Sequence, residues 1–185
     1  MKHDFILASA SPRRKEILMK AGYLFQIIPS EYDEKVNGLI YTDDLIENCA
    51  FQKALEVKNR IKSDIPIVSA DTVVVFENVI LGKPQNKDEA VETLLKLSNN
   101  THFVATSICI LTDDLVIKYT QKTNVSFKKI SLNDAIKYVE IDNPLDKAGS
   151  YGIQDKNFKF IDNIQGEYDN VVGFPLKLFQ EKFRF

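Results

Sequence analysis

The sequence predicts an α/β protein with a mixed sheet, and three features support this. Helix-like patterns alternate with short apolar segments through the first 100 residues, which is typical of a sheet with helices packed on it. Two long β-type segments follow at 102–111 and 115–127, and the polar turn Thr112-Asp113-Asp114 between them predicts an antiparallel hairpin. The 185 residues contain no repeat or linker-like stretch, so we predict a single domain over 1–185.

Composition excludes several classes of protein. Hydrophobic residues make up 44% and charged residues 27%, which is typical of globular proteins. No apolar run approaches the ~20 residues that span a membrane, and the apolar stretch near the start is too short for a signal peptide. The net charge of −2 argues against nucleic acid as the partner. Cys49 and Cys109 lack a CxxC spacing, so we expect inert core thiols and a reducing, cytoplasmic location.

Apolar runs that end at turns predict the remaining strands. These strands are placed at 5–8, 24–28, within 66–76, and at 158–161. The run at 66–76 is mostly β-branched, and the short strand at 158–161 lies in a glycine-rich, loop-rich region between 149 and 173. Residues 30–41 are predicted to form a polar loop.

Capping residues predict where five helices begin. Ser11, Thr42, Asn86, Ser131 and Pro175 each precede or open a helical pattern. The predicted helices start after these residues and extend to Gly22, to about 63, to 97, to 141 and to 183. Gly22 is expected to end the first helix because glycine adopts a left-handed backbone readily.

The strongest chemical signal is the segment from Ser9 to Lys15. Only four of the 24 basic residues are Arg, yet Arg13 and Arg14 lie side by side in the first turn of the first helix. Positive charge there is disfavoured by the helix dipole by about 0.3–1 kcal/mol per residue. An anion would reverse this penalty, because helix N–H groups, the hydroxyls of Ser9 and Ser11, and guanidinium groups all bind phosphate. A solvated basic patch is the alternative.

Further charged residues lie in apolar or turn contexts. Asp71 interrupts an apolar strand, so it is either satisfied by backbone N–H groups or it binds Mg²⁺ or accepts a proton from water. Lys53 lies in the apolar stripe of a helix, so it either extends to solvent or points into a phosphate cleft. Lys83 lies in a Gly-Lys-Pro turn that lacks the P-loop pattern.

The acidic loop after the second strand contains Glu31, Asp33 and Glu34, for which simple solvation is the alternative to metal binding. Together the charged residues predict an enzyme acting on phosphate esters and dependent on Mg²⁺. His3 and His102 are too few and too far apart for a zinc pair. Neither a GxSxG motif nor a Cys–His arrangement indicates nucleophilic catalysis.

Seven segments resemble the Maf family in order and spacing, from residue 6 to residue 178. They are ILASASPRRKEIL, Glu34, ENCAFQKA, VSADTVVV, LGKP, DKAGSYGIQ and GEYDNVVGFPL. Maf proteins are nucleoside triphosphate pyrophosphatases, once described as septum-formation inhibitors. The resemblance implies a fold similar to inosine triphosphate pyrophosphatases, with helices flanking a central mixed sheet and a cleft between two lobes. It also implies hydrolysis between the α and β phosphates, giving NMP and diphosphate, with a divalent metal cation, Mg²⁺ or Mn²⁺.

The resemblance also implies roles for individual residues. Asp71 matches the proton acceptor, and Glu34 matches an acidic position that we interpret, with Asp71, as a metal ligand. The predicted catalytic residues are Asp71, Lys53 and Lys83, and the predicted substrate-binding residues are Ser9, Ser11, Arg13, Arg14, Thr72 and Gln154. The combination Arg13, Thr72 and Gln154 resembles the subgroup acting on dTTP and UTP, whereas the 7-methyl-GTP subgroup has a Trp in the first motif.

Three departures from the family pattern leave the preferred base open. Asn99 or Asn100 replaces a usual glycine, Ser150 replaces the second glycine of Gly-Gly-Tyr, and Phe174 replaces leucine in Gly-Leu-Pro. Two other functions are retained as alternatives: a nucleotide-binding regulator of cell division without turnover, and a phosphomonoesterase. The expected partner is the nucleoside triphosphate, not nucleic acid or a membrane, and homodimer formation is left open.

Overall fold

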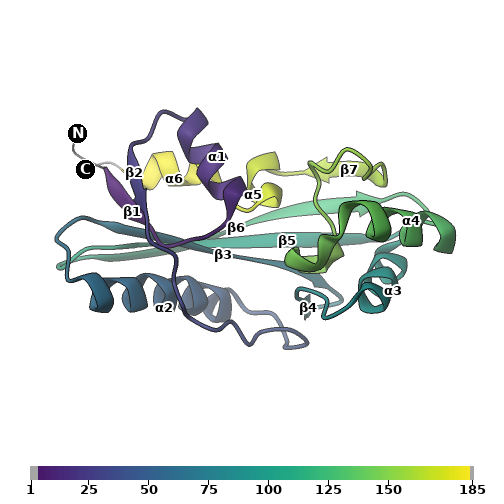
Figure 1. The fold of residues 1–185 in the computed structure, drawn as a ribbon, viewed down its shortest axis with the longest axis horizontal. Coiled ribbons are helices and arrows are strands. Elements are labelled where there is room, and N and C mark those ends of the chain that lie inside the picture. Colours follow the sequence, from purple (N-terminus) through teal and green to yellow (C-terminus); the bar gives the residue numbers. More distant parts are fainter. Residues whose placement is uncertain (1–3, 184–185) are drawn as a thin grey trace.

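The computed structural model describes residues 4–183, which form the predicted mixed α/β fold (Figure 1). Its strands are β1 (Phe5–Leu7), β2 (Phe25–Ile27), β3 (Ile67–Phe76), β4 (Val79–Leu81), β5 (Thr101–Leu111), β6 (Val116–Phe127) and β7 (Ile161–Gln165). Its α-helices are α1 (Pro12–Lys20), α2 (Asp43–Ile61), α3 (Lys87–Leu97), α4 (Leu132–Asp142), α5 (Tyr168–Val172) and α6 (Leu176–Lys182). Two short 3-10 helices, η1 (Pro144–Asp146) and η2 (Ala148–Ser150), follow α4. The predicted domain 1–185 therefore extends slightly beyond the described range, and His3 lies outside it.

Within the described residues the strands form one seven-stranded sheet in the order β2-β1-β3-β5-β6-β7, with β4 also paired to β3. The pairs β2–β1 and β1–β3 are parallel, whereas β3–β4, β3–β5, β5–β6 and β6–β7 are antiparallel. The sheet is therefore mixed, as the sequence predicts, and the predicted hairpin of β5 and β6 runs along the length of the molecule (Figure 1).

Helix starts follow the predicted capping residues. The side chains of Ser11, Thr42, Asn86 and Ser131 each accept a hydrogen bond from the backbone N–H three residues later, at 2.9–3.5 Å. Helix α1 ends before Gly22, which has a left-handed φ of +85° as expected for a residue after a helix. Side-chain capping thus explains why sequence alone located these helices within about two residues.

Three short elements differ from the sequence prediction. The last strand was predicted at 158–161, but β7 spans Ile161–Gln165, because Phe158 is buried in a cluster of aromatic rings and follows a turn at Asp155. Strand β4 was not predicted, although Glu77 and Asn78, both with positive φ, form the tight turn that precedes it. Helix α5 lies in a segment that the sequence predicts as loop, because five residues are too few to show a helical period.

The core is divided between two lobes that share β3, β5 and β6. In one lobe, α2 packs against one face of the sheet, and α1 and α6 pack against the other (Figure 1). In the other lobe, α3 and α4 pack with the far ends of β5 and β6 around the rings of Phe127, Tyr138 and Phe158. This agrees with the expected two-lobed arrangement.

Both cysteines are buried in the first lobe as free thiols, as predicted. Burial raises the pKa of Cys49 to about 11 and that of Cys109 to about 12, so both are protonated and unreactive near neutral pH. None of the helices within residues 4–183 combines the length and the apolar character that crossing a membrane requires.

Candidate active site

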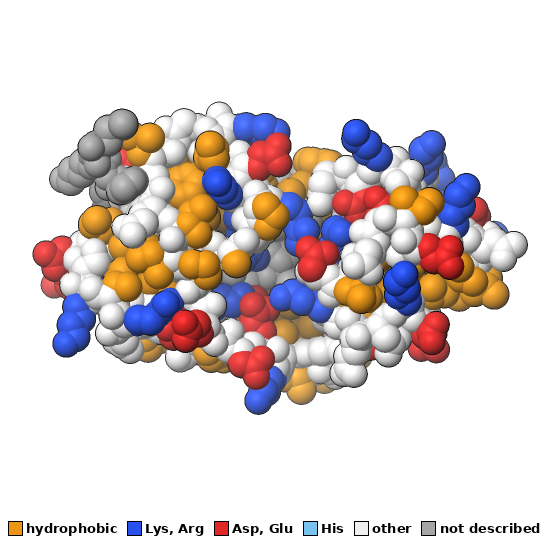
Figure 2. Space-filling view, in the orientation of Figure 1, with side chains coloured by type: hydrophobic (Ala, Val, Ile, Leu, Met, Phe, Trp, Pro, Cys, Tyr) orange, Lys and Arg blue, Asp and Glu red, His pale blue; other side chains and the backbone are white. Residues whose placement is uncertain are grey.

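The central strand β3 has no strand partner along one part of one side. β1 pairs with Ile67 and Val68, β4 pairs with residues from Val74 to Phe76, and among the described strands none pairs on this side of the segment between them. Asp71 and Thr72 lie in this gap. A cleft of about 360 Å³ opens there, and the surface is hollowed between the two lobes where basic and acidic side chains gather (Figure 2).

All ten predicted site residues line this one cleft. They are Ser9, Ser11, Arg13, Arg14, Glu34, Lys53, Asp71, Thr72, Lys83 and Gln154. They come from the start of α1, the loop after β2, helix α2, strand β3, the turn after β4 and the loop after η2. The acidic neighbours of Glu34 do not line it: Glu31 pairs with Arg60, and Asp33 pairs with Lys35. Both side chains are exposed, at 77% for Glu31 and 75% for Asp33.

Successive side chains along β3 point to opposite faces of the sheet. On one face, Ser69 bonds to the carbonyl of Ala50 in α2, and Asp71 contacts Lys53 of the same helix. On the other face, Thr72 bonds to Arg14 of α1. One strand therefore supplies a carboxylate to one side of the cleft and a hydroxyl to the other.

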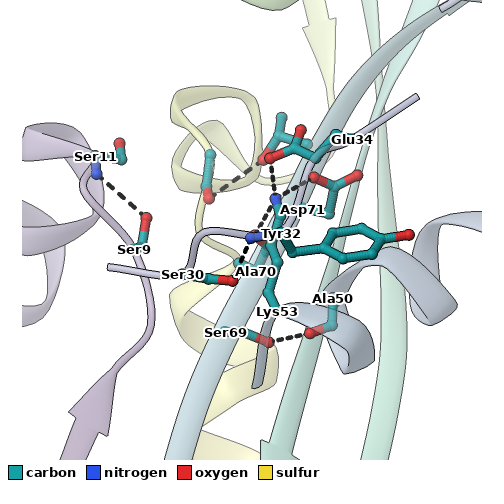
Figure 3. A network of polar contacts seen from close by, with 12 residues as sticks. Ser9, Ser11, Ser30, Tyr32, Glu34, Ala50, Lys53, Ser69, Ala70 and Asp71 are labelled. Atoms are coloured by element: carbon teal, nitrogen blue, oxygen red, sulfur yellow. Dashed lines mark hydrogen bonds and ion pairs between the residues drawn. The ribbon is translucent and has the colours of Figure 1, made fainter. Parts of the chain in front are cut away.

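The carboxylates of Asp71 and Glu34 share the ammonium group of Lys53 (Figure 3). Lys53 Nζ lies 2.5 Å from Asp71 Oδ1 and 2.5 Å from Glu34 Oε1, and it donates to the carbonyl of Ala70 at 3.3 Å. The Lys53 side chain is only 7% exposed. The alternative of a lysine that extends to solvent is therefore wrong.

The two carboxyl groups differ in their pKa. Burial raises the pKa of Asp71, as does the neighbouring charge of Glu34, whereas Lys53 opposes the rise. For Glu34, burial also disfavours the charged form, but the charges of Lys53 and Lys83 and the hydrogen bond from Lys53 lower the pKa to about 2. Glu34 is therefore ionised near neutral pH, and Asp71 is the stronger base of the pair.

Asp71 keeps one oxygen available. Its Oδ2 is buried and has no hydrogen-bond partner among the described residues, so the strand-end aspartate satisfied by backbone N–H groups is excluded. Unpartnered buried carboxylate oxygens are costly, which indicates that a ligand, water or cation belongs there. This orphaned oxygen fits a divalent cation.

The residues present would supply only part of a metal's ligands. Within residues 4–183, no group of three or more His, Cys, Asp or Glu side chains is placed to hold a metal ion. Mg²⁺ in enzymes that act on phosphates often takes one or two carboxylates, and phosphate oxygens and waters complete its coordination. The pair of Glu34 and Asp71 matches that donor set.

The start of α1 is organised around the partly buried Arg14. Its Nε donates to the carbonyl of Gly173 at 2.9 Å, Nη1 to Ser9 Oγ at 3.1 Å, and Nη2 to Thr72 Oγ1 at 3.0 Å. Burial lowers the pKa of Arg14 from its usual value, and the charge of Asp71 opposes that change. The guanidinium stays protonated at any physiological pH. A solvated basic patch does not describe this residue.

Arg13 lies nearer the mouth of the cleft. Its Nη1 contacts Asp146 Oδ2 at 3.1 Å, and 25% of its side chain is exposed. Ser9 Oγ also accepts from the backbone N–H of Ser11 at 3.2 Å, which shapes the turn before α1 (Figure 3). The first turn of α1 contains no acidic residue, so its dipole and its two guanidinium groups present positive charge to the cleft.

Sequence reasoning missed several residues on the cleft walls. Tyr32, Asp146, Lys147 and Tyr151 also line it. Tyr138 donates to Asp155 Oδ2 at 2.6 Å and accepts from the N–H of Gly152 at 3.1 Å, which anchors the loop that carries Gln154. The sequence offered one signal for three of these residues: Asp146, Lys147 and Tyr151 lie in DKAGSYGIQ, one of the seven segments that resemble the family.

Comparisons with known proteins show the family to which this chain is similar over almost its whole length. Residues 4–184 match the family model described as Maf-like protein. A dTTP/UTP pyrophosphatase of Bacillus anthracis (strain CDC 684 / NRRL 3495) is 45% identical over 171 residues, which cover 92% of this chain and 89% of that protein. A dTTP/UTP pyrophosphatase of Bacillus cereus (strain G9842) is 44% identical over 171 residues, which again cover 92% of this chain and 89% of that protein.

Among solved structures, a nucleoside-triphosphatase / dITP/XTP pyrophosphatase from Mycobacterium abscessus is 13% identical. The match covers 66% of this chain and 73% of that chain, with a TM-score of 0.48.

Proposed function

Because this chain belongs to the Maf family, we propose that it is a nucleoside triphosphate pyrophosphatase acting on dTTP and UTP. It hydrolyses the α–β phosphoanhydride and releases NMP and diphosphate. The observation that carries the proposal is the buried Asp71 with one unpartnered oxygen, held by Lys53 among cations in a single cleft. A carboxylate in so costly a place is expected of a catalyst more than of a binding protein.

The triphosphate is held by three cations of the cleft. Arg13, Arg14 and Lys83 would contact its oxygens, together with N–H groups at the start of α1, whereas the three donors of Lys53 are already taken by Asp71, Glu34 and the carbonyl of Ala70. Three donors of Arg14 are already satisfied by the protein, so its remaining N–H groups are fixed in direction before the substrate arrives. Such preorganised charge stabilises the negative charge of a phosphoryl-transfer transition state.

Asp71 acts as the general base. Water attacks the α-phosphorus as its proton passes to Asp71, the new P–O bond forms, and the bond to the β-phosphate oxygen breaks. Diphosphate leaves with the electron pair of that bond. Lys53 orients Asp71 through Oδ1, which leaves Oδ2 to accept the proton.

Glu34 would hold a divalent cation, Mg²⁺ or Mn²⁺, and Asp71 would share it only until its Oδ2 accepts the proton. When bound, such a cation neutralises phosphate charge and acts as a Lewis acid on a phosphoryl oxygen. The depressed pKa of Glu34 keeps this carboxylate ionised for that purpose over the whole physiological range.

Base preference is assigned to Arg13, Thr72 and Gln154. The hydroxyl of Thr72 is shared with Arg14 and Thr106, so its orientation is fixed. Gln154 lies exposed in the opposite wall of the cleft, where its amide can bond to a base edge. The buried, free thiols agree with a cytoplasmic location. A link to cell-division arrest and a homodimer stay predictions.

The deciding experiment is a screen of nucleoside triphosphates with Mg²⁺ or Mn²⁺ and identification of the products. Diphosphate and NMP from dTTP or UTP are the expected products. Release of orthophosphate alone would indicate a phosphomonoesterase. Binding of nucleotides with no product from any of them would indicate a nucleotide-binding regulator of cell division instead.

A further inference from the structure

Asp146, a carboxylate outside the catalytic pair, contacts two cations that line the cleft, Arg13 and Lys147. Asp146 Oδ2 lies 3.1 Å from Arg13 Nη1, and Asp146 Oδ1 lies 3.3 Å from Lys147 Nζ. Arg13 belongs to α1 in the first lobe, whereas Asp146 ends η1 in the second. All three residues line the cleft, so this ion pair joins the two lobes at the place where a substrate enters.

The exposure of the three side chains is unequal. Asp146 is 63% exposed, Arg13 is 25% exposed and Lys147 only 11%. Lys147 Nζ also lies 3.4 Å from Asp155 Oδ2, and Asp155 accepts a hydrogen bond from the buried Tyr138. Asp146 is therefore the residue of the three that can leave its partners at least cost, while Lys147 keeps a second carboxylate and stays in place.

The chemistry of the contact is that of phosphate recognition. An anion with one oxygen on a guanidinium and another on an ammonium is the arrangement that these cations offer to phosphate groups. We propose that Asp146 is a placeholder for a substrate phosphate: its carboxylate occupies Arg13 and Lys147 in the empty cleft, and an incoming phosphate group displaces it. The proposal rests on the proposed function and assigns Lys147 to the anion-binding set.

The placeholder has a physical consequence for affinity. Without Asp146, Arg13 and Lys147 would repel one another across an empty cleft, and any anion would bind without competition. With Asp146 present, an anion must break this ion pair in order to bind. Anion binding is therefore weakened by the free energy that the ion pair contributes. Exposed ion pairs contribute little, which predicts a change of about two- to fivefold in the dissociation constant.

The test is calorimetric titration of inorganic diphosphate into the metal-free protein at low ionic strength. Asp146→Asn keeps the shape of the side chain, and we expect it to lower the dissociation constant about two- to fivefold. Lys147→Gln should raise the dissociation constant, and in the double variant Asp146→Asn, Lys147→Gln the gain from Asp146→Asn should shrink. Thermal melting of each variant confirms that it is folded.

Asp113→Asn is the matched control. Asp113 is 61% exposed and pairs with Lys58 at 2.7 Å, away from the cleft, so this variant removes one surface charge and one ion pair without touching the site. Its dissociation constant for diphosphate should equal that of the wild type. A similar tightening in Asp113→Asn would assign the effect to net charge and overturn the proposal.

An unchanged or raised dissociation constant in Asp146→Asn would also overturn it, because Asp146 would then be inert or part of the binding machinery. Diphosphate release from dTTP by the wild type is measured separately. If release occurs while Asp146→Asn fails to tighten binding, the placeholder is wrong and the proposed function stands. If Asp146→Asn tightens binding but no triphosphate is hydrolysed, the proposed function is wrong and the placeholder stands.

Discussion

At the scale of single residues, the site depends on charges that lie where an apolar side chain would be expected. Lys53 in an apolar helix stripe and Asp71 in a β-branched strand each have a large burial cost, and each offsets the cost of the other. The sequence alone could therefore identify each of these residues, because a charged residue inside an apolar pattern is recognised without knowledge of the fold. The distance of 2.5 Å between Lys53 Nζ and Asp71 Oδ1 could not be predicted, because it depends on how α2 crosses β3.

Replacing Asp71 with Asn tests the proposed base. We expect kcat for diphosphate release from dTTP or UTP to fall by at least ~10², because general-base action is typically worth about 10²–10⁴-fold. Nucleotide binding and thermal stability should persist, since Lys53 keeps Glu34 as a partner. A near-normal kcat would assign the proton transfer to another group.

Replacing Gln154 with Ala tests base selection. Gln154 is exposed on the cleft wall, so truncation should leave the fold intact. We expect the ratio of kcat/KM between pyrimidine and purine triphosphates to change more than kcat for dTTP. If the ratio stays at its wild-type value, Gln154 has no part in selectivity.

At the scale of elements, the sequence located those whose boundaries are set by local chemistry. Side-chain caps placed α1, α2, α3 and α4, because each cap satisfies a backbone N–H within its own helix. The predicted position of β7 differs from the observed one by several residues, because pairing with β6 around a bulge at Ser126 and Phe127 sets where this strand lies. Pairing between segments distant in sequence is tertiary information, which a local pattern does not contain.

The arginine that joins α1, β3 and α5 supplies a prediction at this scale. Arg14 bonds to Gly173, Ser9 and Thr72, and a lysine offers one ammonium in place of this planar fork. We therefore expect Arg14→Lys to lower the free energy of unfolding by about 1–3 kcal/mol, the cost of leaving buried partners unsatisfied, and to lower kcat/KM. Urea unfolding and steady-state kinetics measure the two effects. Retention of both values would show that charge alone suffices at this position.

The close approach of η2 to β3 supplies a second prediction at the scale of elements. Gly149 has φ +66°, and a Cβ there would lie 2.6 Å from Val74 Cγ2. We expect Gly149→Ala to cost about 2–4 kcal/mol of unfolding free energy by urea titration, from left-handed strain plus overpacking. Gly22→Ala is the control: its φ is +85° but nothing lies within 4 Å of the added Cβ, so only the strain of about 1–2 kcal/mol should appear. Equal losses in both variants would mean that the contact with Val74 relaxes freely.

At the scale of the whole molecule, the cleft exists because two lobes share three long strands while, within residues 4–183, no strand pairs with β3 between β1 and β4. The charged motifs of the sequence predicted which residues would meet, and all ten line one cleft. The opposite wall was largely missed. Asp146, Lys147 and Tyr151 lie in the segment DKAGSYGIQ, but no role is predicted for them, because only the packing of the second lobe brings them to the cleft.

The second lobe also makes overall stability depend on pH through His102. This residue is 3% exposed, its Nε2 lies 2.8 Å from the hydroxyl of Tyr151, and its Nδ1 has no hydrogen-bond partner in the part of the chain that the structure describes. Burial lowers the pKa of His102 to about 4, below the value of about 6.5 in an unfolded chain. Between these values the unfolded state binds more protons, so the free energy of unfolding falls as the pH falls from about 6.5 towards 4.

The expected loss from His102 is about 3 kcal/mol by pH 4, since one pKa unit is worth about 1.4 kcal/mol. Other groups titrate nearby: the raised pKa of Asp71 stabilises the fold as the pH falls, and the lowered pKa of Glu34 acts mainly below about pH 4.5. Both remain in His102→Gln, so the difference between wild type and variant isolates the histidine. Urea unfolding of both proteins from pH 7.5 to 4 should show a steeper loss for the wild type. Parallel curves would mean that His102 gains a proton without leaving the folded lobe.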